Sequence, residues 1–185
     1  MAAQPPVCDF GWKARDAELL GVDGKTHRIF GGRGDRGLLV AFICNHCPYV
    51  KAVIERLVRD AGDLATLGIG TVAISSNDVE AYPQDSFDNM KRFAETHDFP
   101  FPYLFDEDQS IAKTYGAVCT PDFFGFNADL KLQYRGRIDA SRKEQAPQGT
   151  ARDLFDAMRM VAETGKGPLD QIPSIGCSIK WKDAA

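Results

Sequence analysis

The sequence predicts an α/β fold in which helices flank a central mixed β-sheet. Residues 38–43 form a continuous apolar run, Leu-Leu-Val-Ala-Phe-Ile, which is typical of a strand buried on both faces. Apolar residues then recur at intervals of mostly three or four positions from Val50 to Leu64. This spacing indicates an amphipathic helix that ends near Gly62 or Gly68. A strand that leads directly into a helix is the unit from which α/β proteins are built.

The rest of the chain continues this alternation and then changes character. The expected elements are, in order, strand 69–75, a helix around residues 87–94, strand 103–105, a short helix at 109–115, an antiparallel hairpin of strands 122–127 and 131–136, and a last helix at 150–163. The C-terminal tail is rich in Pro, Gly and Ser, and we expect it to be irregular. Because no linker or internal repeat is recognisable, residues 1–185 are expected to form a single domain.

Composition and charge argue against several classes of protein. Hydrophobic residues make up 44% of the chain and charged residues 26%, as in ordinary globular proteins. The formal net charge of −4 and the scattered basic residues argue against a nucleic-acid partner. The N-terminus lacks a signal-peptide pattern, and no stretch reaches the ~18 apolar residues of a membrane-spanning helix. We therefore expect no membrane association and a cytoplasmic location.

Two of the five cysteines, Cys44 and Cys47, form a Cys-x-x-Cys pair where the first strand passes into its helix. Unpaired backbone N–H groups and the helix dipole favour an anion at a helix N-terminus. The pKa of a cysteine there falls from ~8.5 to between ~3.5 and ~7.5, and the thiolate is the nucleophile in disulfide exchange. The sequence therefore predicts a thiol–disulfide oxidoreductase in which Cys44 attacks and Cys47 resolves the mixed disulfide.

The neighbours of the pair fit this chemistry better than metal binding. His46 lies between the cysteines, where an imidazolium would stabilise the thiolate and make the disulfide more oxidising. Pro48 suits the first turn of a helix, because its missing N–H has no partner there. Zinc sites usually need four ligands, and neither a second cysteine pair nor histidines at ligand spacing are present. We expect no metal and no cofactor.

The sequence resembles the thioredoxin superfamily, and within it the redoxin-type proteins related to the alkyl-hydroperoxide-reductase/thiol-specific-antioxidant (AhpC/TSA) group. The resemblance covers nearly the whole chain, including a match to a bacterial group of uncharacterised redoxins. It is carried by strand 38–43, Cys-Asn-His-Cys-Pro-Tyr-Val-Lys at 44–51, Ala-Val-Cys-Thr-Pro at 117–121 and Pro-Ser-Ile-Gly-Cys-Ser-Ile-Lys-Trp at 173–181.

The resemblance implies a thioredoxin-like fold with Pro121 as a cis proline facing the redox pair. Thr120 would then lie opposite Cys44, and its backbone would receive the substrate chain as an added strand. Asn45 and Pro48, beside the cysteines, are the other expected substrate contacts. The partners implied are protein or small-molecule thiols and disulfides, together with a dithiol reductant or oxidant.

Two departures from the thioredoxin pattern limit this comparison. The segment between Cys47 and Pro121 is longer than a minimal thioredoxin needs, which implies an inserted strand–helix unit around residues 78–103. Thioredoxins also carry a buried acid in the strand before the pair, and residues 38–43 contain none. His46 is the candidate base that remains.

Two of the other three cysteines have two interpretations each. Cys119 is a candidate auxiliary thiol because it stands two residues before Pro121, but free cysteine is also a common small core residue. Cys177 is either an exposed second thiol or part of a docked tail. Cys8 is given no role.

Two alternative functions stay open. The first is a peroxiredoxin-like thiol peroxidase, an antioxidant protein in which one cysteine becomes a sulfenic acid. Peroxiredoxins typically carry Pro-x-x-x-Thr/Ser-x-x-Cys, whereas counting back from Cys44 gives Gly37 and Ala41. The second is a non-catalytic binding module that keeps the fold and uses the pair for metal binding or structural bonding.

Overall fold

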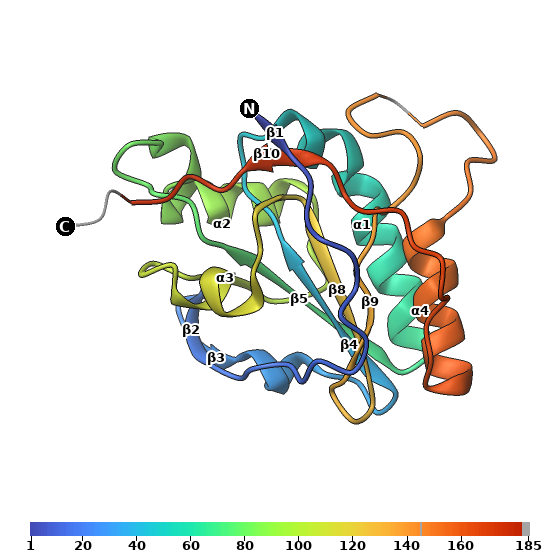
Figure 1. Cartoon of the computed structure of the whole chain (residues 1–185). Helices are drawn as coiled ribbons and strands as arrows, with labels where there is room; N and C mark the ends of the chain where they lie inside the picture. Colours follow the sequence, from blue (N-terminus) through green and yellow to red (C-terminus); the bar gives the residue numbers. More distant parts are fainter. Residues whose placement is uncertain (145, 183–185) are drawn as a thin grey trace.

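A central β-sheet runs through the computed structural model, which describes residues 1–144 and 146–182 (Figure 1). One half has the strand order β3-β2-β6-β5 and the other β4-β8-β9. The halves meet where the Ile43 N–H donates to the Ile74 carbonyl at 2.9 Å. The bounds are β2 Glu18–Gly21, β3 Thr26–Arg28, β4 Gly37–Phe42, β5 Ile69–Ser75, β6 Tyr103–Phe105, β8 Asp122–Asn127 and β9 Leu132–Tyr134. Only β5 and β6 are paired in parallel among the pairs that have a defined register, so the sheet is mixed, as predicted.

The central strand β4 supplies side chains to two separate cores. All six of its residues are buried. Leu39 and Ala41 join the core on one face of the sheet, whereas Leu38, Val40 and Phe42 join the core on the other. A strand covered on both faces has no solvent-facing positions, which explains the continuous apolar run in the sequence.

Three helices cover the first face: α1 Pro48–Thr66, α2 Phe87–Thr96 and α4 Asp153–Thr164. Figure 1 shows α1 and α4 side by side. The apolar residues of α1 recur every three or four positions and are buried against the sheet. The helix ends just before Gly68, whose φ of +81° favours glycine.

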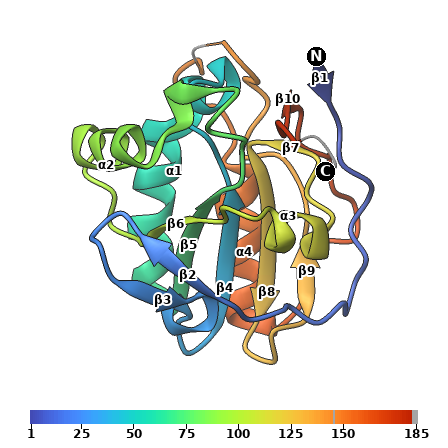
Figure 2. The ribbon, with the colours of Figure 1, turned by 90° about the vertical axis from the view of Figure 1, so that its left-hand side faces the viewer.

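The opposite face is covered by the short helix α3, Ser110–Tyr115, and by the N-terminal segment. In Figure 2, α3 lies in front of the sheet and α4 lies behind it. Asp106 stabilises the start of this helix, because its carboxylate accepts the backbone N–H groups of Ile111 and Ala112 at 3.1 and 2.9 Å. The acidic run at 106–108 thus caps a helix, which satisfies N–H groups that otherwise have no partner.

Most predicted elements are present, and two regions differ from expectation. Strands 69–75 and 103–105 have the predicted bounds, and the insertion contains a 3₁₀ turn, Pro83–Asp85, followed by α2. The hairpin of β2 and β3 was not predicted. Its strands are only four and three residues long and mostly exposed, so they carry little apolar pattern. None of the helices in the described part of the chain is long and apolar enough to cross a membrane.

A second, small sheet lies at the end of the molecule where α1 begins (Figure 1). It has the order β1-β10-β7, with β1 Ala2–Ala3, β7 Cys119–Thr120 and β10 Gly176–Ser178, all antiparallel. The tail expected to be irregular therefore contains a strand. Three residues are too few to show an alternating apolar pattern in the sequence. The strand β10 is recognisable only from its pairing with β1 and β7.

We expect Leu57→Ala to destabilise the protein by about 2–5 kcal/mol, because Leu57 is fully buried between α1 and the sheet and the change leaves a cavity. The free energy of unfolding in urea measures this loss. Leu169→Ala is the matched control: Leu169 is 86% exposed, and the same truncation there should cost less than about 0.5 kcal/mol. Equal losses for the two variants would contradict the proposed packing of α1.

Candidate active site

The cysteine pair lies in the turn that joins β4 to α1. The strand ends at Phe42, and Cys47 is the N-cap of the helix that begins at Pro48. Both thiols are buried, with exposed fractions of 1% for Cys44 and 0% for Cys47. The prediction assigned the stabilised position at the helix N-terminus to Cys44. In the structure Cys47 is the N-cap and Cys44 precedes it by three residues, in the turn after β4.

Thr120 contacts both cysteines from the loop that faces the helix. The Thr120–Pro121 peptide bond is cis, as the family resemblance implied. The Thr120 hydroxyl lies 3.2 Å from the Cys44 sulfur, and the Cys47 thiol donates to the Thr120 carbonyl at 3.2 Å. Thr120 thus lies opposite the pair and contacts Cys44 through its hydroxyl and Cys47 through its carbonyl.

Asp85 is the main residue that the sequence analysis missed. Its carboxylate is fully buried and accepts four hydrogen bonds: from the backbone N–H groups of Asn45 and His46, from the Asn77 side chain at 2.7 Å, and from His46 Nδ1 at 2.6 Å. The residue comes from the 3₁₀ turn of the insertion. A buried acid therefore lies beside the turn, although residues 38–43 contain none. No sequence motif relates Asp85 to Cys44, so the sequence analysis could not find it.

His46 points toward Asp85 through Nδ1, and its ring stacks on Tyr82 with the ring centroids 5.9 Å apart. The side chain is 26% exposed. Any positive charge on this ring is paired with a buried carboxylate. The ring would therefore stabilise a thiolate of the pair less than the sequence suggested.

Asn45 and Pro48 differ in their access to a substrate. The Asn45 side chain accepts from the Tyr103 hydroxyl at 3.0 Å and donates to the Gln84 carbonyl at 3.3 Å, so it is engaged inside the protein. Burial raises the pKa of Tyr103, which keeps this donor protonated. Pro48, by contrast, is exposed at the first position of α1.

The environment of the pair separates the two thiols. A hydrogen bond from Cys44, with further hydrogen bonds from Cys177 and the Val50 N–H, lowers the pKa of Cys47 to about 5 despite burial. The same contact with Cys47, together with burial and the Asp85 charge, raises the pKa of Cys44 well above its usual value. The two sites titrate as a pair. The contacts with Thr120 differ for the two sulfur atoms: the Cys47 thiol donates to its carbonyl, and the Cys44 sulfur lies beside its hydroxyl, which acts to lower the pKa of Cys44.

The remaining cysteines lie at different distances from this pair. Cys177 in β10 is directly opposite Thr120 in β7, and it packs against the core that contains both redox cysteines. Cys119 precedes Thr120 in the strand, so its side chain leaves the opposite face, and its thiol lies 3.6 Å from the Pro121 carbonyl. Cys8 packs on the other side of the central sheet.

The pairing of β10 with β7 changes the expected mode of substrate binding. The backbone of Thr120 was expected to receive a substrate chain as an added strand. In the structure this edge is occupied by the chain's own residues Gly176–Ser178. An external peptide reaches it only if β10 moves away.

Cys44, His46 and Asp85 also bring together atoms of the types that bind metals. These atoms lie within 4.8 Å of one another, a grouping that the sequence spacing did not indicate. The donor set is incomplete for a structural zinc site, which usually has four ligands. The two Asp85 oxygens already accept four N–H groups.

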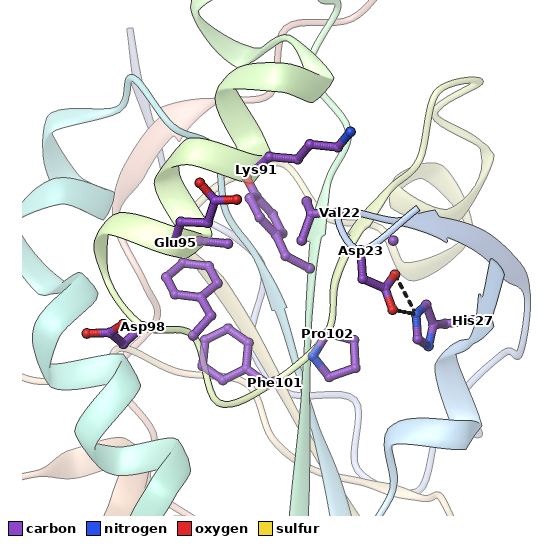
Figure 3. Close-up of a pocket in the computed structure, with 12 residues that line it drawn as sticks. Val22, Asp23, His27, Lys91, Glu95, Asp98, Phe101 and Pro102 are labelled. Atoms are coloured by element: carbon purple, nitrogen blue, oxygen red, sulfur yellow. Dashed lines mark hydrogen bonds and ion pairs between the residues drawn. The ribbon is translucent and has the colours of Figure 1, made fainter. Parts of the chain in front are cut away.

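Two hollows of different size are open to solvent. A cavity of about 100 Å³ lies beside Pro121 and is lined in part by Tyr49, Arg137 and Asp139. A larger one, of about 520 Å³, lies between α2 and the β2–β3 hairpin (Figure 3). Figure 3 shows Lys91 and Glu95 of α2 on one side of it and the Asp23–His27 ion pair on the other. The larger hollow is lined by none of the predicted site residues.

Comparison with known proteins supports the fold and identifies the family. A structure from Geobacillus kaustophilus, titled an uncharacterized conserved protein, is 45% identical with a TM-score of 0.93, and the alignment covers 100% of this chain and 98% of that one. A hypothetical protein from Sinorhizobium meliloti 1021 is 38% identical with a TM-score of 0.92, covering 98% and 99% of the two chains. A thioredoxin family thiol:disulfide interchange protein from Chlorobium tepidum TLS is 18% identical with a TM-score of 0.62, covering 82% and 97%, and this similarity shows the fold alone.

A search of the curated proteins found no match. Residues 10–135 match the model of the AhpC/TSA family, which is more than half of the sequence. The chain therefore belongs to the AhpC/TSA family and is a redoxin with a thioredoxin-like fold.

Proposed function

We propose that the protein is a thiol–disulfide oxidoreductase whose redox centre consists of Cys44 and Cys47. The observation that carries this proposal is the position of both thiols at the start of α1, where Cys44 and Cys47 each contact Thr120. A thiolate at neutral pH next to a second thiol is the arrangement that disulfide exchange requires. The cis proline at Pro121 and the Thr120 contacts support the same conclusion.

We assign the attack to Cys44 and the resolving step to Cys47, as expected from the sequence, because the Cys47 thiol donates to the Thr120 carbonyl and keeps its proton, whereas the Thr120 hydroxyl beside the Cys44 sulfur can donate to a thiolate. The Cys44 thiolate attacks a substrate disulfide and bonds to one sulfur, while the other leaves as a thiolate and takes a proton from solvent. Cys47 then loses its proton and attacks the Cys44 sulfur. The bound substrate thiolate leaves and is protonated, so two electrons have passed from the pair to the substrate. A dithiol reductant returns the pair to its reduced form, and the same steps in reverse oxidise substrate thiols.

The proposed substrates are small-molecule disulfides or disulfides on exposed loops of other proteins. The cavity beside Pro121 is small compared with the 300–1,000 Å³ typical of ligand pockets, so it suits the tip of a substrate and not a large ligand. Because β10 covers the edge of β7, binding by strand addition is disfavoured.

Peroxidase activity is the second candidate, because the chain belongs to the AhpC/TSA family. The Pro-x-x-x-Thr/Ser-x-x-Cys pattern is absent before Cys44. Counting back from Cys47 places Cys44 and Val40 at its Thr/Ser and Pro positions. The pattern is therefore missing for both cysteines, which leaves disulfide exchange as the leading proposal.

We expect equilibration of the purified protein against glutathione buffers to give a reversible Cys44–Cys47 disulfide, located by mass spectrometry after acid quenching. Because a thiolate stabilised at the start of α1 favours the reduced form, its reduction potential should be less negative than thioredoxin's value of about −270 mV. Cys44→Ser should abolish the reaction with disulfides, and Cys47→Ser should accumulate mixed disulfides on Cys44.

Three results would count against this mechanism. Full reactivity of Cys44→Ser, together with its loss in Cys47→Ser, would reverse the order of attack. A pair that stays reduced in every glutathione buffer but is oxidised by hydrogen peroxide would favour the peroxidase. Stoichiometric zinc that disappears when the cysteines are replaced would favour a non-catalytic metal-binding module.

Asp85→Asn should lower the pKa of Cys44, because the Asp85 charge is one of the causes that raise it. It should also destabilise the protein by about 1–3 kcal/mol, since the amide replaces an acceptor of buried N–H groups with a donor. The pH profile of Cys44 alkylation, measured in a Cys47→Ser background, tests the first effect. Asp106→Asn is the matched control: this buried acid caps α3, and its loss should destabilise the fold without moving the Cys44 profile. Identical profiles for the two variants would remove Asp85 from the redox site.

A further inference from the structure

We propose that Asn77 is a positioning residue, which holds the Asp85 carboxylate against the redox turn, residues 43–47 between β4 and α1. The inference rests on the proposed function and deepens it, because it gives Asn77 a part in the reactivity of the same cysteine pair. It also makes the docked C-terminal tail a support of that pair.

The two oxygen atoms of Asp85 have different partners. Oδ1 accepts the backbone N–H groups of Asn45 and His46 at 2.8 and 3.2 Å. Oδ2 accepts two side chains, His46 Nδ1 at 2.6 Å and Asn77 Nδ2 at 2.7 Å. The bonds to Oδ2 therefore fix the rotation of the carboxylate that keeps Oδ1 on the backbone of the turn.

Asn77 connects this carboxylate to the central sheet. Of the four N–H donors that the described residues supply to Asp85, three belong to Asn45 and His46, so they move whenever the redox turn moves. The fourth, Asn77, lies two residues after the end of β5, and only 4% of its surface is exposed. It is therefore the donor that holds Asp85 in place independently of the turn.

The C-terminal tail orients the Asn77 amide. The backbone N–H of Lys180 donates to Asn77 Oδ1 at 2.9 Å, which leaves the NH₂ group of the same amide to face Asp85. Two further bonds fix the tail at this point: the Asp78 N–H and Gln109 Nε2 both donate to the Lys180 carbonyl at 2.8 Å. One buried amide thus joins the tail to the carboxylate of the redox turn.

Charge links this geometry to the reactivity of Cys44. After the contact with Cys47 and burial, the Asp85 charge raises the pKa of Cys44. An N–H that donates to a carboxylate compensates part of that charge, so the carboxylate should act more strongly on the thiol when Asn77 is removed. The other titratable groups near Cys44 are Cys47, His46 and Tyr103. Among all these groups, the described hydrogen bonds connect Asn77 to Asp85 alone.

The test compares Asn77→Ala with Gln109→Ala in the full chain. Gln109 is the matched control, because it is also a buried amide that holds the tail but is not among the donors to Asp85. Asn77→Ala should move the pH midpoint of Cys44 alkylation, measured in a Cys47→Ser background, upward by about one pH unit. Gln109→Ala should leave this midpoint unchanged, although it also removes buried hydrogen bonds and lowers stability.

A double substitution tests whether Asn77 acts through the carboxylate. In an Asp85→Asn background, Asn77→Ala should no longer move the midpoint, because the charge that Asn77 compensates is absent. Hydrogen exchange gives a second readout: the N–H groups of Asn45 and His46 should exchange at least about tenfold faster in Asn77→Ala. Their exchange rates should not change in Gln109→Ala.

A measurement on the unmodified protein keeps the inference testable if Asn77→Ala does not fold. The NMR signals of the Asn77 side-chain amide should shift when the cysteine pair is oxidised, because this amide is bonded to the carboxylate beside the pair. The side-chain amide signals of Gln109 should not shift. Equal behaviour of the two amides overturns the inference.

The outcomes separate this inference from the proposed function. A Cys44 midpoint that Asn77→Ala does not move, or that Gln109→Ala moves equally, overturns the inference, and the proposed function stands if the cysteine pair still forms its disulfide reversibly. The inference also fails if Asn77→Ala has its full effect without the Asp85 charge. A pair that forms no disulfide in any glutathione buffer overturns the proposed function, and with it the part of Asn77 in reactivity.

Discussion

The geometry of the site depends on one buried carboxylate. Asp85 accepts the backbone N–H groups of Asn45 and His46, which lie between the two cysteines and have no partner in β4 or α1. Buried N–H groups without partners are costly, so the turn keeps its shape only while Asp85 is in place. The carboxylate comes from the insertion between β5 and α2. The inserted segment is therefore a structural part of the redox turn, in addition to any effect that it has on partner choice.

The same carboxylate acts on the pKa of the pair as well as on its geometry. The negative charge of Asp85 is one of the causes that raise the pKa of Cys44, whereas the Thr120 hydroxyl beside the same sulfur acts to lower it. The chemistry of the pair thus depends on two segments that are distant in the sequence, the insertion that carries Asp85 and the loop that carries Thr120.

The sequence predicted the parts of the fold whose signal is local. The continuous apolar run of β4 and the spacing in α1 reflect burial of those same residues, and the cis Thr120–Pro121 bond followed from a family pattern. The start of α1 was harder to place, because a shift of three residues between Cys44 and Cys47 changes no apolar pattern. Asp85 and β10 had no local signal at all. A buried acid and a three-residue strand are recognisable only from the distant segments that surround them.

The position of β10 links the closed state of the site to its chemistry. A redox pair with almost no exposed surface is protected from adventitious oxidation, but it is also protected from its own substrates and reductants. The strand β10 is short and pairs only within the small sheet, although the residues after it are also tied to Asn77 and Gln109. Local opening of such a segment costs far less than global unfolding. Release of β10 would thus expose the edge of β7 beside the redox pair and leave the strand pairing of the central sheet in place.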